Sequence, residues 1–329
     1  MNDSSRSTVG YIGLGTMGAP MALNLLKAGY RVVVNDIRRE AAAVHVQSGA
    51  IWADTPRALA EQCEIVFSCL PSLDAIETVA LGEDGVCAGV RPATAFFEMS
   101  TSTRELVKRL HASFAERGAH MLDAPVTGGA KGAEDKRLSI YVGGDEAVFQ
   151  RHEPVLKAIA EHPMYVGELG AGLIVKLIHN CAIQTTQAAI AEGFILGVKA
   201  GIDPLKLWRA LRQSLAGRRR TFDDLFAQFL IGEYDRTTAP LWIVLKDMRG
   251  VTELALDLGV PLRFAHLALA DIQEAANRGW SNRDVRSVML LPQERVGVDI
   301  KVEPVQIDEV LRADPPAPSD VKFGVVSQP

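Results

Sequence analysis

The sequence has little cysteine and no long uncharged apolar run. Its 329 residues include only 4 cysteines, none in a CxxC pair, which argues against a disulfide framework and favours a reducing, cytoplasmic compartment. No apolar run approaches the roughly 18 residues that a membrane span needs. The first 15 residues also lack the apolar segment of a secretory signal. We therefore expect neither a membrane protein nor a secreted one.

The chain also lacks an excess of positive charge. Its formal net charge is −5 and its pI is about 5.9, so it has no electrostatic footprint for nucleic acid or an anionic membrane. Its 7 histidines show no metal-binding spacing such as HExxH, and we expect no metal site. The remaining balance, 48% apolar and 23% charged residues, is typical of a globular protein with room for two domains.

Short apolar runs alternate with helix-like stretches over the first half of the chain, which predicts βαβ units and a parallel sheet. After Gly170 the periodicity is helical almost without a break to about residue 279, starting with one long helix over 171–200. The fold class is therefore an α/β domain followed by an all-α domain, with a Pro-rich tail that we expect to be extended or mobile. The three predicted parts are 1–168, 169–291 and 292–329.

A glycine-rich segment follows the first apolar run and opens a helical pattern. It reads GxGxxG, in which glycine permits a tight turn and a close approach of the backbone to a pyrophosphate, while the helix start offers free N–H groups. Asp36 follows Gly13 by 23 residues, the spacing of a carboxylate that holds ribose hydroxyls. The pattern predicts a doubly wound, Rossmann-type dinucleotide domain; the alternative is a purely structural glycine turn. The predicted cofactor residues here are Gly13, Leu14, Gly15, Thr16, Met17, Gly18, Asn35 and Asp36.

The residues after this strand bear on the choice of dinucleotide. Asp36 favours NAD, because a carboxylate repels the 2′-phosphate of NADP. Arg38 and Arg39 keep NADP possible, since guanidinium groups could bind that phosphate; alternatively they only solvate the start of the next helix.

Two further strand ends are expected to face the same crevice, because ligands of open α/β sheets bind at the carboxyl ends of the strands. Leu70 and Pro71 end one apolar run, and Ser100 and Thr101 end the next. The proline could instead merely terminate its strand. The Ser-Thr-Ser hydroxyls could also cap the helix predicted over 103–118.

Four motifs in order resemble the β-hydroxyacid dehydrogenase family, which includes 3-hydroxyisobutyrate dehydrogenase and tartronate semialdehyde reductase. They are GLGTMGAPMALNLLKAGY (13–30), DAPVTGGAKGA (123–133), GAGLIVKLIHN (170–180) and LKD (245–247). The resemblance implies an enzyme that transfers a hydride between NAD(P) and a small β-hydroxy acid or its semialdehyde. It also implies a small carboxylate as substrate and a homodimer or homotetramer formed through the helical domain.

By this resemblance Lys176 is the catalytic acid and base, and Asn180 is its neighbour at the substrate. The two residues are spaced i and i+4, so they share one helix face. That face also carries Gly172 and Leu173, and we expect Gly172 to leave room for a ligand. We interpret His179 as structural. The competing interpretations are a surface lysine and an asparagine that bonds to a neighbouring helix.

Thr127, Gly128 and Gly129 form the second predicted site. Two glycines after a hydroxyl residue can present successive backbone N–H groups to an anion. The resemblance implies that this loop holds the substrate carboxylate, and we assign Ser100, at its strand end, to substrate binding as well. A loop that merely needs positive φ angles is the alternative.

The second half of the chain carries one further predicted residue and two departures from the family. The resemblance implies that Lys246 reaches the nicotinamide end of the cofactor; otherwise it is an exposed lysine beside Asp247. Relatives commonly have an aromatic residue where Ala239 stands, and Trp242 either compensates or belongs to a helix core. The run 218–220, three arginines, is either a solvated face or a site for a second acidic group of the substrate.

Four other functions compete with this one. An imine reductase of similar architecture would usually lack the lysine at position 176. A reader of nucleosome surfaces should have lost that lysine and gained basic or aromatic modules. Only the presence of all the predicted catalytic residues argues against a non-catalytic NAD-binding scaffold. A dehydrogenase of bulkier β-hydroxy-α-amino acids would suit the small Ala239.

Overall fold

The computed structural model describes residues 7–218, 226–235, 237, 239–297 and 299–313. The chain divides into two compact units, Met1–Ala182 and Ile183–Pro329. Helix α9 (Ala171–Lys199) begins in the first unit and ends in the second, which confirms the prediction of one long helix after Gly170.

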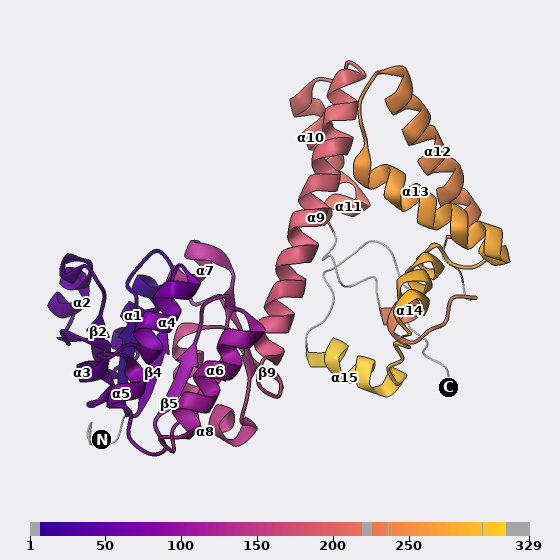
Figure 1. The fold of residues 1–329 in the computed structure, drawn as a ribbon. Coiled ribbons are helices and arrows are strands. Elements are labelled where there is room, and N and C mark those ends of the chain that lie inside the picture. Colours follow the sequence, from indigo (N-terminus) through magenta and orange to yellow (C-terminus); the bar gives the residue numbers. More distant parts are fainter. Residues whose placement is uncertain (1–6, 219–225, 236, 238, 298, 314–329) are drawn as a thin grey trace. The chain divides into compact units, whose positions relative to one another are not determined.

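The first unit is a nine-stranded sheet with helices on both faces (Figure 1). Its strand order is β3-β2-β1-β4-β5-β6-β8-β7, and β9 pairs with β8. The strands are β1 (Thr8–Ile12), β2 (Arg31–Asn35), β3 (Ile51–Trp52), β4 (Ile65–Ser68), β5 (Ala95–Glu98), β6 (His120–Asp123), β7 (Val126–Thr127), β8 (Ser139–Gly143) and β9 (His162–Gly167). The helices are α1 (Gly18–Lys27), α2 (Ala43–Gln47), α3 (Pro56–Ala60), α4 (Leu73–Leu81), α5 (Val86–Gly89), α6 (Arg104–Ala115), α7 (Gly129–Glu134) and α8 (Glu146–Ile159).

The central strands are buried on both faces, which explains why they appear in the sequence as unbroken apolar runs. Alternate side chains of one strand enter two different cores, because successive residues of a strand point to opposite faces. Phe67 and Phe97 belong to the core that also contains residues of α1 and α8. Val66 and Phe96 belong to the core that contains residues of α3 and α6. The doubly wound α/β prediction is confirmed.

One part of the sheet differs from the parallel sheet that the sequence predicted. β3, β2, β1, β4, β5 and β6 are parallel, but β8 runs antiparallel to both β6 and β7. The connection between Thr127 and Ser139 holds only the six-residue α7. A parallel crossover needs about a dozen residues or more, so this connection suits an antiparallel pair.

The second unit is helical throughout its described residues. Its α-helices after α9 are α10 (Pro204–Gln213), α11 (Leu215–Arg218), α12 (Leu241–Asp257), α13 (Arg263–Ala275), α14 (Leu290–Val296) and α15 (Pro304–Ala313), and its shorter helical segments are η2 (Phe226–Leu230), η3 (Ala276–Trp280) and η4 (Val285–Met289). α12 and α13 pack side by side (Figure 1). The prediction of an extended chain after residue 292 is wrong for α15, where Pro304 occupies a helix start and Ile307 is buried. Residues 314–329 lie outside the described part.

Candidate active site

The three glycines of the GxGxxG loop have different environments. Gly13 has a φ of +89°, and a Cβ added to it would lie 2.4 Å from the Cys69 carbonyl oxygen. A Cβ on Gly18 would lie 1.9 Å from the Gly13 carbonyl oxygen. Gly15, by contrast, has no atom within 4 Å of such a Cβ. The first and third glycines therefore serve a tight turn and close packing, while the second leaves open space beside the backbone, as a bound pyrophosphate requires.

Asp36 holds this loop against the end of β2. Its carboxylate accepts hydrogen bonds from the backbone N–H groups of Leu14 at 2.7 Å and Arg38 at 2.9 Å. Asn35 supports the loop from the same strand end, since its carbonyl oxygen accepts from the N–H of Gly13 at 3.0 Å. The Asn35 side chain is buried, and its amide group donates a hydrogen bond to the Ala53 carbonyl oxygen within the protein. Of these two predicted cofactor residues, only Asp36 has a side chain directed to the loop.

Ser100 joins the ends of β4 and β5, which the sequence placed at one crevice. Its Oγ accepts a hydrogen bond from the backbone N–H of Leu70 at 2.8 Å, and its own N–H donates to Glu98 Oε1 at 3.0 Å. The alternative that the Ser-Thr-Ser hydroxyls cap α6 is wrong, because the N-cap is Thr103, whose side chain accepts from the N–H of Leu106.

Glu98 is a site residue that the sequence analysis did not identify. It lies buried at the end of β5 and also accepts a hydrogen bond of 3.4 Å from the Ser68 hydroxyl. Burial raises the pKa of its carboxyl group to about 7, although the hydrogen bonds from Ser100 and Ser68 oppose this shift. Its position at the end of a β-strand, directly before the predicted Ser100, was the available signal.

Asp123 fixes the start of α9, the helix that carries Lys176. One carboxylate oxygen accepts from the N–H of Gly170 and the other from the N–H of Leu173, both at 2.7 Å. The residue is buried, and burial raises the pKa of its carboxyl group. Asp123 is the first residue of the motif 123–133, and no role was predicted for it. Its carboxylate satisfies the free N–H groups at a helix start, which are otherwise left without partners.

Gly172 corrects a prediction. A Cβ at this position would lie 2.2 Å from the Tyr141 carbonyl oxygen and 2.8 Å from that of Asp123. The glycine therefore lets α9 approach the backbone of β8 and β6, and it does not leave room for a ligand. The physical reason is that the first turn of α9 packs directly on the ends of these strands.

Lys176 and Asn180 share one face of α9, and both side chains are half-buried. Burial lowers the pKa of the Lys176 ammonium from its ordinary value, because a partly desolvated site disfavours the charged form. A lysine in this state is better able to give and take a proton near neutral pH than a fully solvated one. The role of Lys176 as acid and base stays a prediction.

His179, which the sequence analysis interpreted as structural, contacts the predicted substrate loop. Its Nε2 lies 2.7 Å from Thr127 Oγ1, a hydrogen bond between α9 and β7. Burial, and secondarily the charge of Lys176, lower the pKa of its imidazole. The expectation of a purely structural histidine followed from its placement on another helix face than Lys176, and the sequence could not show that β7 lies against that face.

The two glycines after Thr127 both have positive φ, +126° at Gly128 and +66° at Gly129. A Cβ on Gly128 would lie 2.9 Å from the Leu138 side chain, whereas Gly129 has no atom within 4 Å of such a Cβ. The loop thus combines a backbone conformation that favours glycine with one open backbone position. Both the structural and the ligand-binding interpretation of these glycines are compatible with this arrangement.

The residues singled out after α9 belong to the second unit. Lys246 lies on α12, is exposed, and has its Nζ 3.3 Å from Asp247 Oδ1. Its role at the cofactor stays a prediction. Trp242 is 49% exposed, so it does not belong to a helix core. Of the three arginines at 218–220, Arg219 and Arg220 lie outside the described residues.

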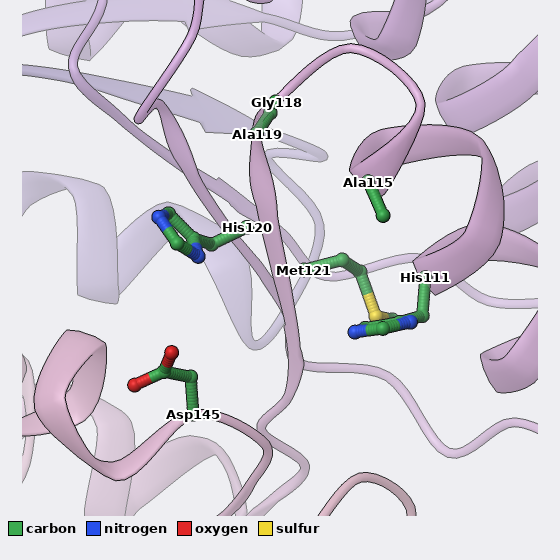
Figure 2. A pocket seen from close by; sticks show the side chains of 7 residues that line it. All are labelled: His111, Ala115, Gly118, Ala119, His120, Met121 and Asp145. Atoms are coloured by element: carbon green, nitrogen blue, oxygen red, sulfur yellow. The ribbon is translucent and has the colours of Figure 1, made fainter.

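A pocket elsewhere in the first unit is distinct from this crevice. His111, His120, Met121 and Asp145 are among the residues that line it (Figure 2). His120 is the first residue of β6, so the pocket lies at the amino end of that parallel strand, opposite the carboxyl ends where ligands of α/β sheets bind. Within the described part of the chain, no three His, Cys, Asp or Glu side chains are placed to hold a metal ion. No described helix has both the length and the apolar character that a bilayer crossing requires.

Comparison with known proteins yields matches over both halves of the chain. Residues 8–167 match the NAD binding domain of 6-phosphogluconate dehydrogenase, and residues 170–291 match the NAD-binding domain of NADP-dependent 3-hydroxyisobutyrate dehydrogenase. The 2-(hydroxymethyl)glutarate dehydrogenase of Eubacterium barkeri is 32% identical over 292 residues, which are 89% of this chain and 97% of that protein.

Solved structures agree with these matches. The 3-hydroxyisobutyrate dehydrogenase of Salmonella typhimurium is 30% identical, with a TM-score of 0.59 over 87% of this chain and 99% of that one. An imine reductase from Pseudomonas sp. has a TM-score of 0.70 over 87% of this chain and 99% of that one, but at 22% identity it shows a shared fold alone. The chain therefore belongs to the β-hydroxyacid dehydrogenase family of NAD(P)-dependent oxidoreductases.

Proposed function

We propose that this protein catalyses reversible hydride transfer between NAD(P) and a small β-hydroxy acid, or the corresponding semialdehyde, with Lys176 as the general acid and base. The observation that carries the proposal is the half-buried Lys176 on α9, with its pKa lowered by burial. It lies one turn before His179, which contacts the Thr127 loop. The bound nicotinamide supplies the hydride chemistry, so the protein has to orient the substrate and move one proton.

Lys176 handles that proton. In the oxidation direction the neutral amine takes the proton of the substrate hydroxyl, and in the reduction direction the ammonium returns it. A general acid and base works best when its pKa is near the working pH, and burial moves the Lys176 pKa in that direction. Asn180, on the same helix face, orients the hydroxyl or the carboxylate.

The GxGxxG loop binds the cofactor, with the pyrophosphate against Gly15 and the start of α1. The open space at Gly15 supports this assignment, as does the absence of an acidic residue in the first turn of α1. Leu70, Pro71, Ser100 and Thr101 line the crevice from the ends of β4 and β5. Asp36, with its carboxylate at the loop, favours NAD, and we expect a higher catalytic efficiency with NAD than with NADP.

The carboxylate of the substrate binds to the loop of Thr127, Gly128 and Gly129. The open backbone at Gly129 and the Thr127 hydroxyl offer hydrogen-bond donors to an anion. The names of the two dehydrogenases compared above describe hydroxy carboxylic acids, which supports this class of substrate. The imine reductase similarity concerns the fold only, and Lys176 favours alcohol chemistry.

We also propose that the protein is a cytoplasmic homo-oligomer. Apolar side chains are exposed along the helices of the second unit, including Ile190, Ile195, Leu256 and Leu267. Exposed apolar side chains that gather into one patch are typical of protein interfaces. The described cysteines Cys63, Cys69 and Cys87 are free thiols, as is usual in a reducing compartment.

The test follows NADH absorbance with a panel of β-hydroxy acids, β-hydroxy-α-amino acids, semialdehydes and cyclic imines. We expect turnover of at least one β-hydroxy acid with NAD. Lys176→Ala should lower kcat by about 10² to 10⁴, the usual contribution of a general acid and base, while its Kd for NADH stays unchanged. Near-normal turnover by Lys176→Ala, or turnover of imines alone, would overturn the proposal.

A further inference from the structure

Glu98 is a buried acid that the proposed proton transfer does not use. Its residue is 1% exposed, and in the register of the sheet it lies between Ser68 of β4 and Asp123 of β6. Its Oε1 accepts hydrogen bonds from the backbone N–H of Ser100 at 3.0 Å and from the Ser68 hydroxyl at 3.4 Å. The carboxyl group is therefore enclosed at the strand ends, in contact with a residue that we assign to the substrate.

The surroundings of Glu98 favour its protonated form. Burial raises the pKa of its carboxyl group to about 7, and the neighbouring Asp123 adds to this shift. The thiol of Cys69 and the phenol of Tyr11 also interact with it electrostatically. Burial raises the pKa of Cys69 to about 12 and raises that of Tyr11 as well, so both groups are uncharged near neutral pH. Glu98 therefore gains or loses its proton in the neutral range.

The protonation state of Glu98 decides what the Ser100 hydroxyl can do for a ligand. A hydroxyl group has one proton and two lone pairs. The backbone N–H of Leu70 donates to Ser100 Oγ at 2.8 Å, and the Ser100 side chain also hydrogen-bonds with the Glu98 carboxyl group. An ionised carboxylate only accepts, so it takes the Ser100 proton. A protonated carboxyl group can donate to the second lone pair of Ser100, which leaves the serine proton free.

We propose that Glu98 in its protonated form is a positioning residue, which donates to Ser100 Oγ and so turns the Ser100 hydroxyl proton toward an acceptor oxygen of the substrate. The inference rests on the proposed function, because it takes Ser100 as a substrate residue. It adds a residue that acts through Ser100 without touching the reacting atoms. Since the substrate binds better to the protonated form, its affinity should fall as the pH rises above about 7.

The test is Glu98→Gln, whose amide keeps an acceptor oxygen for the Ser100 N–H and donates to Ser100 Oγ at every pH. The Kd of 3-hydroxyisobutyrate is measured by calorimetry in the presence of NADH, at pH 6 and at pH 8.5. We expect equal Kd values for variant and wild type at pH 6. At pH 8.5 the variant should bind up to about tenfold more tightly, the effect of one hydrogen bond to a charged group. A merely structural glutamate predicts weaker binding by the variant at both pH values, and that result would overturn the inference.

Proton uptake gives a second readout. If the substrate prefers protonated Glu98, binding at pH 7.5 should take up about half a proton more in wild type than in Glu98→Gln, for a tenfold preference. The uptake is obtained from binding enthalpies in buffers that differ in ionisation enthalpy. Lys176 and His179 are present in both proteins, so the difference between the two reports Glu98. Equal uptake would contradict the positioning role.

Two serine variants show which hydroxyl carries the effect. In the Ser100→Ala background, Glu98→Gln should no longer tighten binding at pH 8.5, because the hydroxyl through which Glu98 acts is absent. Ser68→Ala is the matched control: it removes the other hydroxyl that bonds to Glu98, and the pH dependence of Kd should remain. The melting temperature and the Kd for NADH of each variant report its folding. Tighter binding that persists without the Ser100 hydroxyl would show that Glu98 does not act through it.

Turnover separates this inference from the proposed function. If wild type turns over a hydroxy acid and Glu98→Gln gives no gain in affinity at pH 8.5, the positioning role is wrong and the reaction stands. If the gain in affinity is seen but no hydroxy acid is turned over, the proposed reaction is wrong and the substrate contact of Ser100 stands. If wild type neither binds nor turns over any hydroxy acid, both are wrong.

Discussion

The two units of this chain differ in how completely they bury their own apolar side chains. In the first unit Phe67, Phe96 and Phe97 are fully buried between the sheet and its helices. In the second unit, by contrast, Leu256 is 81% exposed and Leu267 is 67% exposed. Among the described residues of the second unit the buried clusters are small: one is formed by Leu241, Ile272, Ala275 and Leu291, the other by Leu196, Ala255 and Leu262.

This difference follows from architecture. A parallel sheet must have both faces covered, and the crossover helices between its strands cover them. Helices that pack on one another bury only the stripe that faces a neighbour, so any other apolar stripe stays exposed in a single chain. The first unit also contains the buried carboxylates Glu98 and Asp123, which are committed to backbone N–H groups.

The largest effect should come from removing the buried anchor of α9. Asp123→Ala leaves the N–H groups of Gly170 and Leu173 without their acceptor, and at about 1–3 kcal/mol for each buried unsatisfied group we expect a loss of about 4 kcal/mol. The matched variant in the second unit is Asp271→Ala, which breaks an exposed ion pair with Arg295 and should cost less than about 1 kcal/mol. Denaturant unfolding measures the loss in free energy of unfolding for both variants. Equal losses would contradict the predicted difference between the two units.

The second effect concerns pH. The Glu98 carboxyl group has a folded-state pKa of about 7 against an ordinary value of 4.5, so the folded protein binds its proton more tightly than the unfolded chain. The free energy of unfolding should therefore fall as pH rises from about 4.5 to about 7, by up to about 3 kcal/mol from this group alone. Glu98→Gln removes this titration. The free energy of unfolding of the variant, relative to that of wild type, should thus be higher at pH 8 than at pH 5. The same relative value at both pH values would contradict the assignment.

A smaller effect should separate folding from cofactor binding within one loop. Gly18→Ala places a Cβ 1.9 Å from the Gly13 carbonyl oxygen, and we expect overpacking of this kind to cost about 2 kcal/mol. Gly15→Val enters open space, so its melting temperature should match that of wild type while its Kd for NADH rises at least about tenfold, as expected when a side chain blocks a close backbone approach. Thermal unfolding and NADH titration measure the two properties. A destabilised Gly15→Val that binds NADH normally would reverse the roles assigned to these glycines.

The smallest effect on stability should come from the exposed apolar side chains. Leu256→Glu and Leu267→Glu should each change the free energy of unfolding by less than about 0.5 kcal/mol, as is usual for surface substitutions. In a homo-oligomer that buries these side chains, sedimentation should show a shift of both variants toward the monomer mass. Ile37→Glu in the first unit is the control, since Ile37 is fully exposed. An unchanged mass for the two leucine variants would mean that they lie outside any interface.

Local pattern was enough to predict several parts of this molecule. The GxGxxG loop depends on backbone angles and close approaches that only glycine allows, so Gly13 and Gly18 could be assigned from spacing alone. The helical period predicted the long helix α9, and it also predicted that Lys176 and Asn180 lie on the same face of that helix. The strands β1, β2, β4 and β5 were visible because strands buried on both faces are apolar without alternation.

Contacts between distant residues needed the folded chain. Three contacts depend on how strands and helices lie against one another: Leu70 donates to Ser100 across 30 positions, Asp123 binds the start of α9 across 47, and His179 contacts Thr127 across 52. Periodicity says which residues share a face, but it does not say what that face touches. For this reason Gly172 meets protein backbone where we expected a ligand, and the contact of His179 with Thr127 could not be predicted from the sequence.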